Sequence, residues 1–514
     1  MVLLVMLDGA RGDAVESGKM PNLVGLTKNE WQSDYRCAWS LAASVSEIVD
    51  PVSAPNHVSI ATGVTPDRHG VRGNGWTKKG LYAEYPTWLQ RVVNADPRRH
   101  ALFAFSWFED AQLGPSNDVT FVSGSDPANA VTVSTRLAAA DAPDATMYVI
   151  NCPDSGGHAT GYYPRGAKYS ANLAAADSYI GMCLKAIAGR PTFAKEDWLV
   201  IVTSDHGGFL RSHGKSHGHH ALTVPVLVVG RNVTAGHVRA PVFNYDPTAN
   251  ALAHFGIDAA AHSLNARAVT GSVEKVRPLS DGLAVYLPFD NFGNCAPNTA
   301  VTARADAEGL AAVANDGFSG KGLKIAAGGR VLLEGSEKLA FEDGGRSFAA
   351  VVWVRQDQSR LVGDPLIFGN KNWQKGANAG LALVSSGKIT GKRRGVVFNY
   401  VTGSKRRDLG QFFSEDASKW TFYAVTRTDD GSLVFYQGRS DGRLHWIAAD
   451  AAELTLSKTG LPFCLGSDGT GEYTHKYAGE LDEFALWTRG LAHEEVRRIY
   501  EAGRCGQELR TLLK

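Results

Sequence analysis

Three aspartates stand at the ends of apolar stretches that lie far apart in the sequence. Asp8 ends V-L-L-V-M-L-D, Asp154 follows M-Y-V-I-N-C-P, and Asp205 follows W-L-V-I-V-T-S. If these stretches are parallel strands of one sheet, their carboxyl ends share an edge and the three carboxylates converge there. Without a cation, so many buried carboxylates would repel one another strongly. The pattern therefore predicts a site for divalent metal.

Histidines accompany these acids at short spacings. His158 lies four residues after Asp154, His206 is adjacent to Asp205, and His213 follows seven residues later. Three more histidines crowd the last one in sequence, namely His217, His219 and His220. Mixed Asp and His ligation suits Zn²⁺ best, with Mn²⁺ or Fe as alternatives. Taken singly, an aspartate after a strand is more often a helix cap, and a histidine is more often a surface residue or a satisfied core residue.

A serine in P-V-S-A-P-N-H-V-S-I-A-T-G supplies a nucleophile, Ser53. We expect a short helix over Asn56–Thr62, beginning just after Ser53, with Pro55 in its first turn. Backbone N–H groups at such a helix start can bind a developing phosphate oxyanion. A nearby metal would lower the pKa of the hydroxyl and make it an effective nucleophile. The alternative is that Ser53 only caps the helix.

The elements that must position these residues alternate between strand and helix up to about residue 270. A helix is predicted over Ala167–Ile187, with apolar residues at steps of three and four. Short apolar runs typical of buried parallel strands occur at Val2–Leu7, Leu102–Phe105, Met147–Asn151, Trp198–Thr203 and Val224–Val229. This order predicts an α/β domain with a doubly wound, mostly parallel sheet over residues 1–270. The first run is too short for a signal peptide and lacks the basic flank and cleavage site.

After a linker at 271–281, the pattern changes to closely spaced strands with turns rich in Gly, Asp and Ser. Strands are predicted at Ser347–Arg355, Gly395–Val401, Trp420–Arg427, Leu433–Gln437 and Glu480–Trp487. A closing helix, Ala492–Ala502, follows with Gly503 placed to cap it. Residues 282–514 are therefore predicted to form an antiparallel β-sandwich. Of the 15 histidines, 12 lie at or before position 262, which assigns the chemistry to the first domain.

The overall composition excludes some classes of protein. The 514 residues include 53 basic and 52 acidic side chains, a net charge of +1, so binding of a nucleic-acid polymer is not expected. No apolar run approaches the roughly 18–20 residues that span a membrane. The six cysteines form no C-x-x-C pair. Cys295 and Cys505 lie near the two ends of the second domain, and their pairing is left open.

Several motifs occur in an order that resembles the alkaline phosphatase superfamily, and within it the nucleotide pyrophosphatase/phosphodiesterase branch. From Val2 to Gly230 the sequence carries L-D-G-A-R, M-P-N-L-V-G-L, S-A-P-N-H-V-S-I-A-T-G-V-T-P-D-R-H-G, R-G-N-G-W, C-P-D-S-G-G-H, T-S-D-H-G-G and R-S-H-G. Ser53 stands where that branch generally has threonine. The domain is also short, so loops that bind a nucleoside are expected to be reduced.

The resemblance implies two metal sites and a covalent intermediate. Asp154, His158 and His213 would hold one ion, while a second set would hold the other, namely Asp8, Asp205, His206 and Ser53. Ser53 would attack phosphorus in line to give a phosphoseryl intermediate. Asn74, from R-G-N-G-W, would bind a nonbridging phosphate oxygen.

Related reactions remain as alternatives. Sulfatases of this superfamily need a C/S-x-P-x-R signal, and here its arginine position holds His57. Phosphomonoesterases place a cation over the terminal phosphate. The F-S-W-F-E-D segment offers Glu109 and Asp110 there, although Arg72, Lys78 and Lys79 flank Asn74. A phosphomutase would carry a large inserted domain, which is not evident. The sequence thus favours a phosphodiesterase, with a phosphomonoesterase as alternative.

The second domain resembles laminin-G-like, concanavalin-like jelly rolls through L-D-E-F-A-L-W-T-R-G-L-A-H-E-E-V-R-R-I-Y. Carbohydrate contact through Trp373, Trp446 and Tyr473 is one interpretation, and core or hairpin packing is the other. Acidic loops of this domain can hold structural Ca²⁺. We expect a periplasmic or extracellular bacterial enzyme acting on a small-molecule or glycan-linked phosphate ester. The alternative from another class is a glycan-binding protein with an inactive hydrolase domain.

Overall fold

The chain forms two compact units in a computed structural model, Met1–Val273 and Glu274–Lys514. The structure describes all residues except 16, 46–49, 115, 165, 215–218, 239–241, 272–275, 291–295, 297–300, 306–310, 315, 327, 340–346, 357–360, 376–378, 387–394, 403–404, 414–415, 417, 429–431, 441, 443, 451–458 and 514. Each unit has its own sheets and is described by itself.

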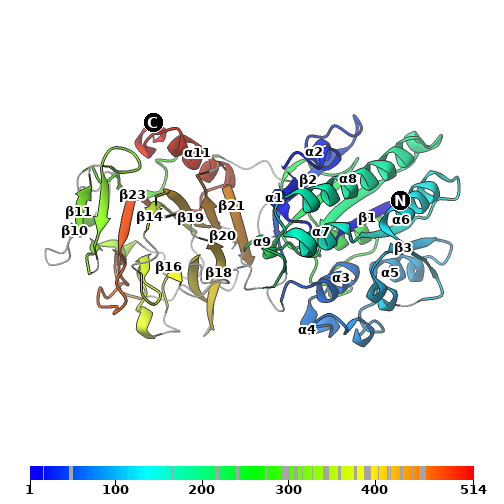
Figure 1. Cartoon of the computed structure of the whole chain (residues 1–514), viewed down its shortest axis with the longest axis horizontal. Coiled ribbons are helices and arrows are strands. Elements are labelled where there is room, and N and C mark those ends of the chain that lie inside the picture. The colour runs from blue at the N-terminus through cyan, green and yellow to red at the C-terminus, as the bar shows by residue number, and fades with distance from the viewer. Residues whose placement is uncertain are drawn as a thin grey trace. The chain divides into compact units, whose positions relative to one another are not determined.

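The first unit is built on one eight-stranded sheet (Figure 1). Its spatial order is β4 (Val119–Ser123), β3 (Ala101–Phe105), β5 (Ala145–Ile150), β1 (Val2–Leu7), β6 (Leu199–Ser204), β7 (Thr223–Gly230), β2 (Arg36–Ser44) and β8 (Gly236–His237). The strands β1, β3, β4, β5 and β6 run parallel, with β1 between β5 and β6. The strand ends that carry Asp8, Asp154 and Asp205 are therefore neighbours at one sheet edge.

The direction of β7 differs from the prediction. The run Val224–Val229 is a buried strand, but it lies antiparallel to both of its neighbours, β6 and β2. A continuous apolar run reports burial on both faces and carries no information on strand direction, so the sequence could not distinguish the two arrangements.

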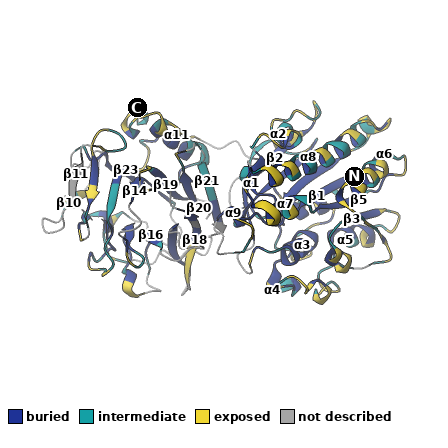
Figure 2. Cartoon of the chain, in the orientation of Figure 1, coloured by how far each residue is buried: buried dark blue, intermediate teal, exposed yellow. Residues whose placement is uncertain are grey.

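Helices cover both faces of this sheet, and alternate residues of β1 enter two separate cores. Val2, Leu4 and Met6 belong to one core, and the residues between them belong to the other. The predicted helix is α8 (Ala167–Ala188), which packs its apolar face on the second core. The remaining helices are α1 (Gly12–Val15), α2 (Pro21–Thr27), α3 (Ser53–Thr62), α4 (Pro66–His69), α5 (Trp88–Ala95), α6 (Asp126–Ala138), α7 (Cys152–Thr160), α9 (His219–Leu222) and α10 (Pro247–His254). Figure 2 shows the central strands buried and the exposed residues on the outer helices and loops.

The second unit is an antiparallel β-sandwich of two sheets. One has the order β10 (Thr302–Ala305), β13 (Val331–Glu334), β22 (Phe463–Leu465), β15 (Leu366–Gly369), β16 (Ala382–Ser386), β17 (Gly395–Thr402) and β18 (Lys405–Phe413). The other has the order β11 (Ala311–Ala314), β12 (Gly322–Ile325), β23 (Gly479–Trp487), β14 (Phe348–Arg355), β19 (Thr421–Arg427), β20 (Ser432–Gly438) and β21 (Leu444–Asp450), with β9 (Leu283–Leu287) also paired to β23.

The closing helix α11 (His493–Arg504) begins after Ala492 and continues past Gly503. The predicted glycine cap is therefore wrong. A Cβ on Gly503 would lie 2.6 Å from Cζ2 of Trp353, so this glycine is required by the close approach of an indole ring. Sequence alone shows the glycine but does not show the neighbour that requires it.

Two further observations concern sequence predictions. None of the described helices combines the length and the apolar character needed to cross a membrane. Cys505 is exposed, whereas Cys295 lies outside the described residues. The pairing of these two cysteines therefore stays a prediction.

Candidate active site

The three strand-end aspartates lie together because the chain makes close backbone approaches there. Asp8 follows β1, and its backbone N–H donates to the carbonyl of Ile150 at 2.9 Å. Gly9 has a φ of 73°, and a Cβ there would lie only 2.7 Å from Cα of Asp154. The N–H of Gly9 also donates to Oδ1 of Asp205 at 2.9 Å. Gly9 thus joins the ends of β1, β5 and β6 into one cluster.

Polar atoms in this cluster lack hydrogen-bond partners although they are buried. Asp8 and Asp205 are 1% and 0% exposed. Within the described part of the chain, Oδ1 of Asp8, Oδ2 of Asp205 and Nε2 of His57 have no hydrogen-bond partner. Unpaired buried acceptors of this kind are costly unless a cation binds them. The side chains present therefore fit a bound divalent metal.

The donor atoms form two groups, each compact enough for one ion. Asp154, His206 and His213 make the first, and Asp8, His57 and Asp205 make the second, with donor atoms within 4.8 Å of one another in each. Nε2 of His206 lies 3.2 Å from Oδ2 of Asp205, so the groups adjoin at this imidazole. The same nitrogen lies 3.6 Å from Oδ1 of Asp8.

The other two predicted histidines also lie at this cluster. Nε2 of His158 is 3.4 Å from Oδ2 of Asp154, and the His158 side chain is 46% exposed. The ring of His213 stacks on that of His206 with centroids 4.0 Å apart. The first group therefore opens to solvent, whereas the second is buried.

The contacts of the histidines in the loop that follows His206 show which of them lies at the acidic cluster. Nδ1 of His220 lies 2.6 Å from Nη2 of Arg11, and its ring stacks on Phe209. The rings of His219 and His220 lie 3.8 Å apart, and His217 is outside the described residues. Of the described histidines in this loop, His213 is the one placed against His206.

Ser53 is the first residue of α3, and Val52 occupies the N-cap position without a side-chain cap. The helix was predicted to begin just after Ser53, but it begins at Ser53 itself. The interpretation of this serine as a helix cap is therefore wrong. Its Oγ lies 3.2 Å from Nε2 of His206, and the residue is 5% exposed. The hydroxyl is therefore directed at the junction of the two donor groups.

The amides at the start of α3 differ from the expectation. The N–H of Ala54 donates to Oδ1 of Asn74 at 3.0 Å, and Pro55 has no N–H. Since the helix amide must face an oxygen, the Nδ2 group of Asn74 is left as the donor side of that side chain. The N–H of Ala54 therefore already has an acceptor, and binding of a phosphate oxygen by Asn74 stays a prediction.

Glu109 fixes the loop that presents Asn74. Its carboxylate accepts the N–H of Gly75 at 2.7 and 2.8 Å and the hydroxyl of Thr77 at 2.9 Å. Glu109 is only 9% exposed. Its neighbour Asp110 is also buried and accepts Nδ1–H of His57 at 2.8 Å. Both acids of the F-S-W-F-E-D segment therefore point into the protein.

The electrostatics of the cluster favour bound cations. Burial, with repulsion from Asp205 and Asp154, raises the pKa of Asp8. Burial and the neighbouring His206 lower the pKa of His213 to about 3, so its imidazole is neutral at ordinary pH. A neutral imidazole is the form that ligates metal.

Four buried or half-buried residues of this site were not predicted as part of it, namely His57, Glu109, Asp110 and Tyr162. The hydroxyl of Tyr162 donates to Oδ1 of Asp154 in a short hydrogen bond. One signal was available for His57, because it follows Ser53 by four residues and a helix places such a pair on one face. Glu109 and Asp110 both come from the 3-10 helix Phe108–Gln112, whose segment was considered only as the place of a cation, and no sequence signal pointed to Tyr162.

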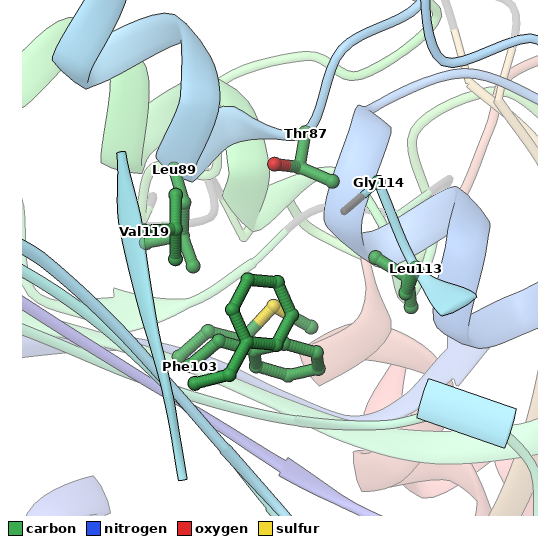
Figure 3. A pocket seen from close by; sticks show the side chains of 8 residues that line it. Thr87, Leu89, Phe103, Leu113, Gly114 and Val119 are labelled. Carbon is green, nitrogen blue, oxygen red and sulfur yellow. The ribbon is translucent and has the colours of Figure 1, made fainter. Parts of the chain in front are cut away.

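A small pocket elsewhere in the first unit carries no comparable chemistry (Figure 3). Its described lining residues are Thr87, Leu89, Phe103, Leu113, Gly114, Val119, Phe121 and Met147. None of these side chains titrates near neutral pH, so the pocket offers no acid, base or metal ligand.

The aromatic residues considered for sugar stacking differ in exposure. Trp373 is 6% exposed and packs in a small core cluster. The guanidinium of Arg406 covers its ring at 4.1 Å, so its face is not available to a sugar. Tyr473 packs against the same cluster, and Trp446 contacts His493 with ring centroids 4.5 Å apart. Structural Ca²⁺ stays a prediction, since both donor groups found among the described residues lie in the first unit.

Comparisons with known proteins give a family match within the first unit. The family model of type I phosphodiesterase / nucleotide pyrophosphatase matches residues 2–137 and 104–209. No curated protein matches the sequence. Among solved structures, murine ectonucleotide pyrophosphatase/phosphodiesterase 5 is 19% identical with a TM-score of 0.32, over 40% of this chain and 57% of that one.

Two further solved structures are also similar to part of the chain. Domain 4 of AbnA, a GH43 extracellular arabinanase from Geobacillus stearothermophilus in complex with arabinotriose, is 14% identical with a TM-score of 0.33, over 42% of this chain and 98% of that one. The binding domain of botulinum neurotoxin DC, in complex with rat synaptotagmin II, is 16% identical with a TM-score of 0.32, over 44% of this chain and 52% of that one. The chain thus spans little more than half of the murine enzyme and of the toxin domain.

Proposed function

We propose that the first unit, which carries a type I phosphodiesterase / nucleotide pyrophosphatase domain, hydrolyses phosphate diesters with Ser53 as nucleophile. The observation that carries this proposal is the position of Ser53. Its Oγ lies 3.2 Å from Nε2 of His206, at the junction of two groups of acid and imidazole donors. A serine at the start of a helix and beside two cation sites has few other roles.

The residues that would hold two divalent ions are those of the predicted sets. Asp154, His158 and His213 would hold one, and Asp8, Asp205 and His206 the other, together with Ser53. When bound, such ions supply positive charge that lowers the pKa of a hydroxyl and stabilises charge on phosphate oxygens. Zn²⁺ fits this donor set best, and Mn²⁺ or Fe are alternatives.

The chain's own groups orient the reaction. Oγ of Ser53 would form a bond to phosphorus as the bond to the leaving alcohol breaks, giving a phosphoseryl intermediate that water then cleaves. Nδ2 of Asn74 would donate to a nonbridging oxygen, because Oδ1 of the same amide accepts the N–H of Ala54. Glu109 holds the loop of Asn74 in place through three hydrogen bonds. These contacts preorganise the site for charge that develops on the phosphate.

The preference for diesters rests on the charges around Asn74. A monoester carries a second negative charge, which a guanidinium or ammonium group would pair. In the F-S-W-F-E-D segment, where a monoesterase would carry such a cation, this chain has the acids Glu109 and Asp110, and both point into the protein. Of the two lysines that follow Asn74 in the sequence, Lys79 lies over the ring of Trp76, with its Nζ 4.2 Å from the ring centroid. This arrangement supports a diester better than a monoester.

A comparison of chromogenic aryl substrates tests the proposal. The metal-loaded protein is assayed with a phosphate diester, a phosphate monoester and a sulfate ester, and kcat/KM is measured for each. We expect the diester to react fastest. Monoester turnover that is faster by orders of magnitude would replace the diesterase proposal with the monoesterase alternative. Absence of turnover on all three, with metal bound, would favour the alternative of an inactive hydrolase domain.

A further inference from the structure

Four imidazoles at the acidic cluster share one arrangement. In each, Nδ1 lies against an oxygen of the chain, at 2.8 to 2.9 Å, and Nε2 is left as the ligating nitrogen. The partners of Nδ1 are Asp110 Oδ1 for His57, Arg211 O for His158, Gly207 O for His206 and Pro51 O for His213. Metal-bound histidines almost always carry such a bond on the nitrogen that does not ligate. Three of the four belong to the predicted ligand sets, and His57 does not.

His57 lies at the second donor group. It follows Ser53 by one helical turn in α3 and is 0% exposed. Its Nε2 is 3.2 Å from Oδ2 of Asp205 and 3.7 Å from Oδ2 of Asp8. This is close to the spacing of His206, whose Nε2 lies 3.2 Å and 3.6 Å from the same two side chains. The two imidazoles are therefore equally well placed toward these carboxylates.

The spacing matches that of atoms bound to one metal ion. Ligands at about 2.0–2.1 Å from a tetrahedral Zn²⁺ stand about 3.3–3.4 Å apart. Nε2 of His57 and Oδ2 of Asp205 face each other at 3.2 Å. Two buried polar atoms at this distance can both contact one cation.

Asp110 fixes which nitrogen of His57 faces the cluster. Asp110 lies in the 3-10 helix η2 (Phe108–Gln112) and is 1% exposed. An ionised carboxylate only accepts hydrogen bonds, so Nδ1 of His57 donates to it and Nε2 is the nitrogen that faces Asp8 and Asp205. Among the four histidines, His57 alone has a carboxylate as this partner, and such a hydrogen bond increases the basicity of a ligating imidazole.

We propose that His57, oriented by Asp110, is a ligand of the cation held by Asp8, Asp205 and His206. The inference rests on the proposed function in one respect, since it requires that a cation binds there. It adds a donor to the predicted second set and gives Asp110 a positioning role. The second ion would then be held by four protein side chains before Ser53 contacts it.

The test is a direct observation of metal–nitrogen bonds. The full chain is labelled with ¹⁵N-histidine and loaded with ¹¹³Cd²⁺, and scalar coupling between ¹¹³Cd and ¹⁵N is measured by NMR. We expect coupling at Nε2 of His57 as well as at His158, His206 and His213. The resonance of His57 is assigned by its absence in His57→Gln. A control variant, His69→Gln, removes another buried histidine, whose Nε2 contacts Oγ of Ser59 3.0 Å away, and should leave all four couplings in place.

The outcomes separate this inference from the proposed function. Coupling at the other three histidines, with a proton on Nε2 of His57, would overturn the inference and leave the catalytic proposal standing. No cadmium coupling at any histidine would overturn both. Titration of the apo-protein with Cd²⁺ gives a second measure. His57→Gln should weaken the second equivalent by more than about 100-fold, and Asp110→Asn by about 10- to 100-fold, as expected for a residue that only orients a ligand.

Discussion

Oγ of Ser53 lies 3.2 Å from Nε2 of His206, although 153 positions separate the two residues. The contact joins the first residue of α3 to the segment that directly follows β6. Asp205, next to His206, is in turn tied to Gly9 at the end of β1. The candidate nucleophile and the candidate metal ligands thus lie together, and the roles proposed for them lead to the following predictions.

Ser53→Ala should abolish turnover of a chromogenic diester while nearly all bound metal is retained. Loss of the nucleophile is expected to lower kcat by roughly four orders of magnitude or more. Ser59→Ala is the matched control, because Ser59 lies in the same helix and its Oγ donates to the carbonyl of Pro55. Kinetics and elemental analysis on both variants decide the matter, and wild-type rates in Ser53→Ala would refute the assignment.

Glu109→Ala should lower kcat/KM by about tenfold through the loop that carries Asn74. The change removes an acceptor for the N–H of Gly75 and the hydroxyl of Thr77, so the Asn74 amide is no longer held in one orientation. Metal content should not change. Glu84→Ala alters an exposed glutamate nearby and serves as control. Equal kinetics in the two variants would show that the loop needs no such support.

Gly9→Ala should destabilise the first unit by about 2 kcal/mol or more and weaken metal binding. A methyl group there meets the backbone of Asp154 at 2.7 Å, and the φ of 73° is unfavourable for alanine. Gly256→Ala isolates the second effect, because Gly256 has a φ of 74° with nothing within 4 Å. Thermal unfolding should show a smaller loss for Gly256→Ala, and equal losses would contradict the close approach.

Chelation of the bound metal should destabilise the first unit, and more at pH 8 than at pH 5. The pKa of Asp8 is raised by burial and by Asp205 and Asp154. Without a cation, the stability that this neutral carboxyl contributes is full below its unfolded pKa and is lost as the pH rises. Differential scanning calorimetry with and without EDTA provides the measurement. A shift in Tm that is independent of pH would argue against like-charge repulsion as the cause.

The sandwich unit should become less stable between about pH 4 and pH 8. Burial raises the pKa of Asp482 to about 8 and that of Glu483 to about 7. Each group's stabilisation is present below its unfolded pKa, 3.8 for Asp482, and is lost as the pH rises through the folded value. Asp482→Asn should reduce this pH dependence in denaturant unfolding. If the free energy of unfolding depends on pH equally in the variant and in the wild type, other groups cause the pH dependence.

The sequence by itself determined the acids at the strand ends, because an aspartate after a buried apolar run has a fixed place at a sheet edge. The strands at Val2–Leu7 and Trp198–Thr203 and the helix at Ala167–Ile187 follow from periodicity alone, as do the strands of the sandwich. The motif order also identified Ser53 as the nucleophile candidate. Local patterns of this kind survive folding because burial of apolar residues decides them.

Only the tertiary structure decided which groups support these residues. The direction of β7 and the need for glycine at position 503 depend on neighbours that are distant in sequence. The same holds for Asp110 beside His57 and for Glu109 beneath the loop of Asn74. Hydrogen bonds and close contacts between separate elements leave no periodic trace in the chain, since each depends on the packed arrangement of both partners.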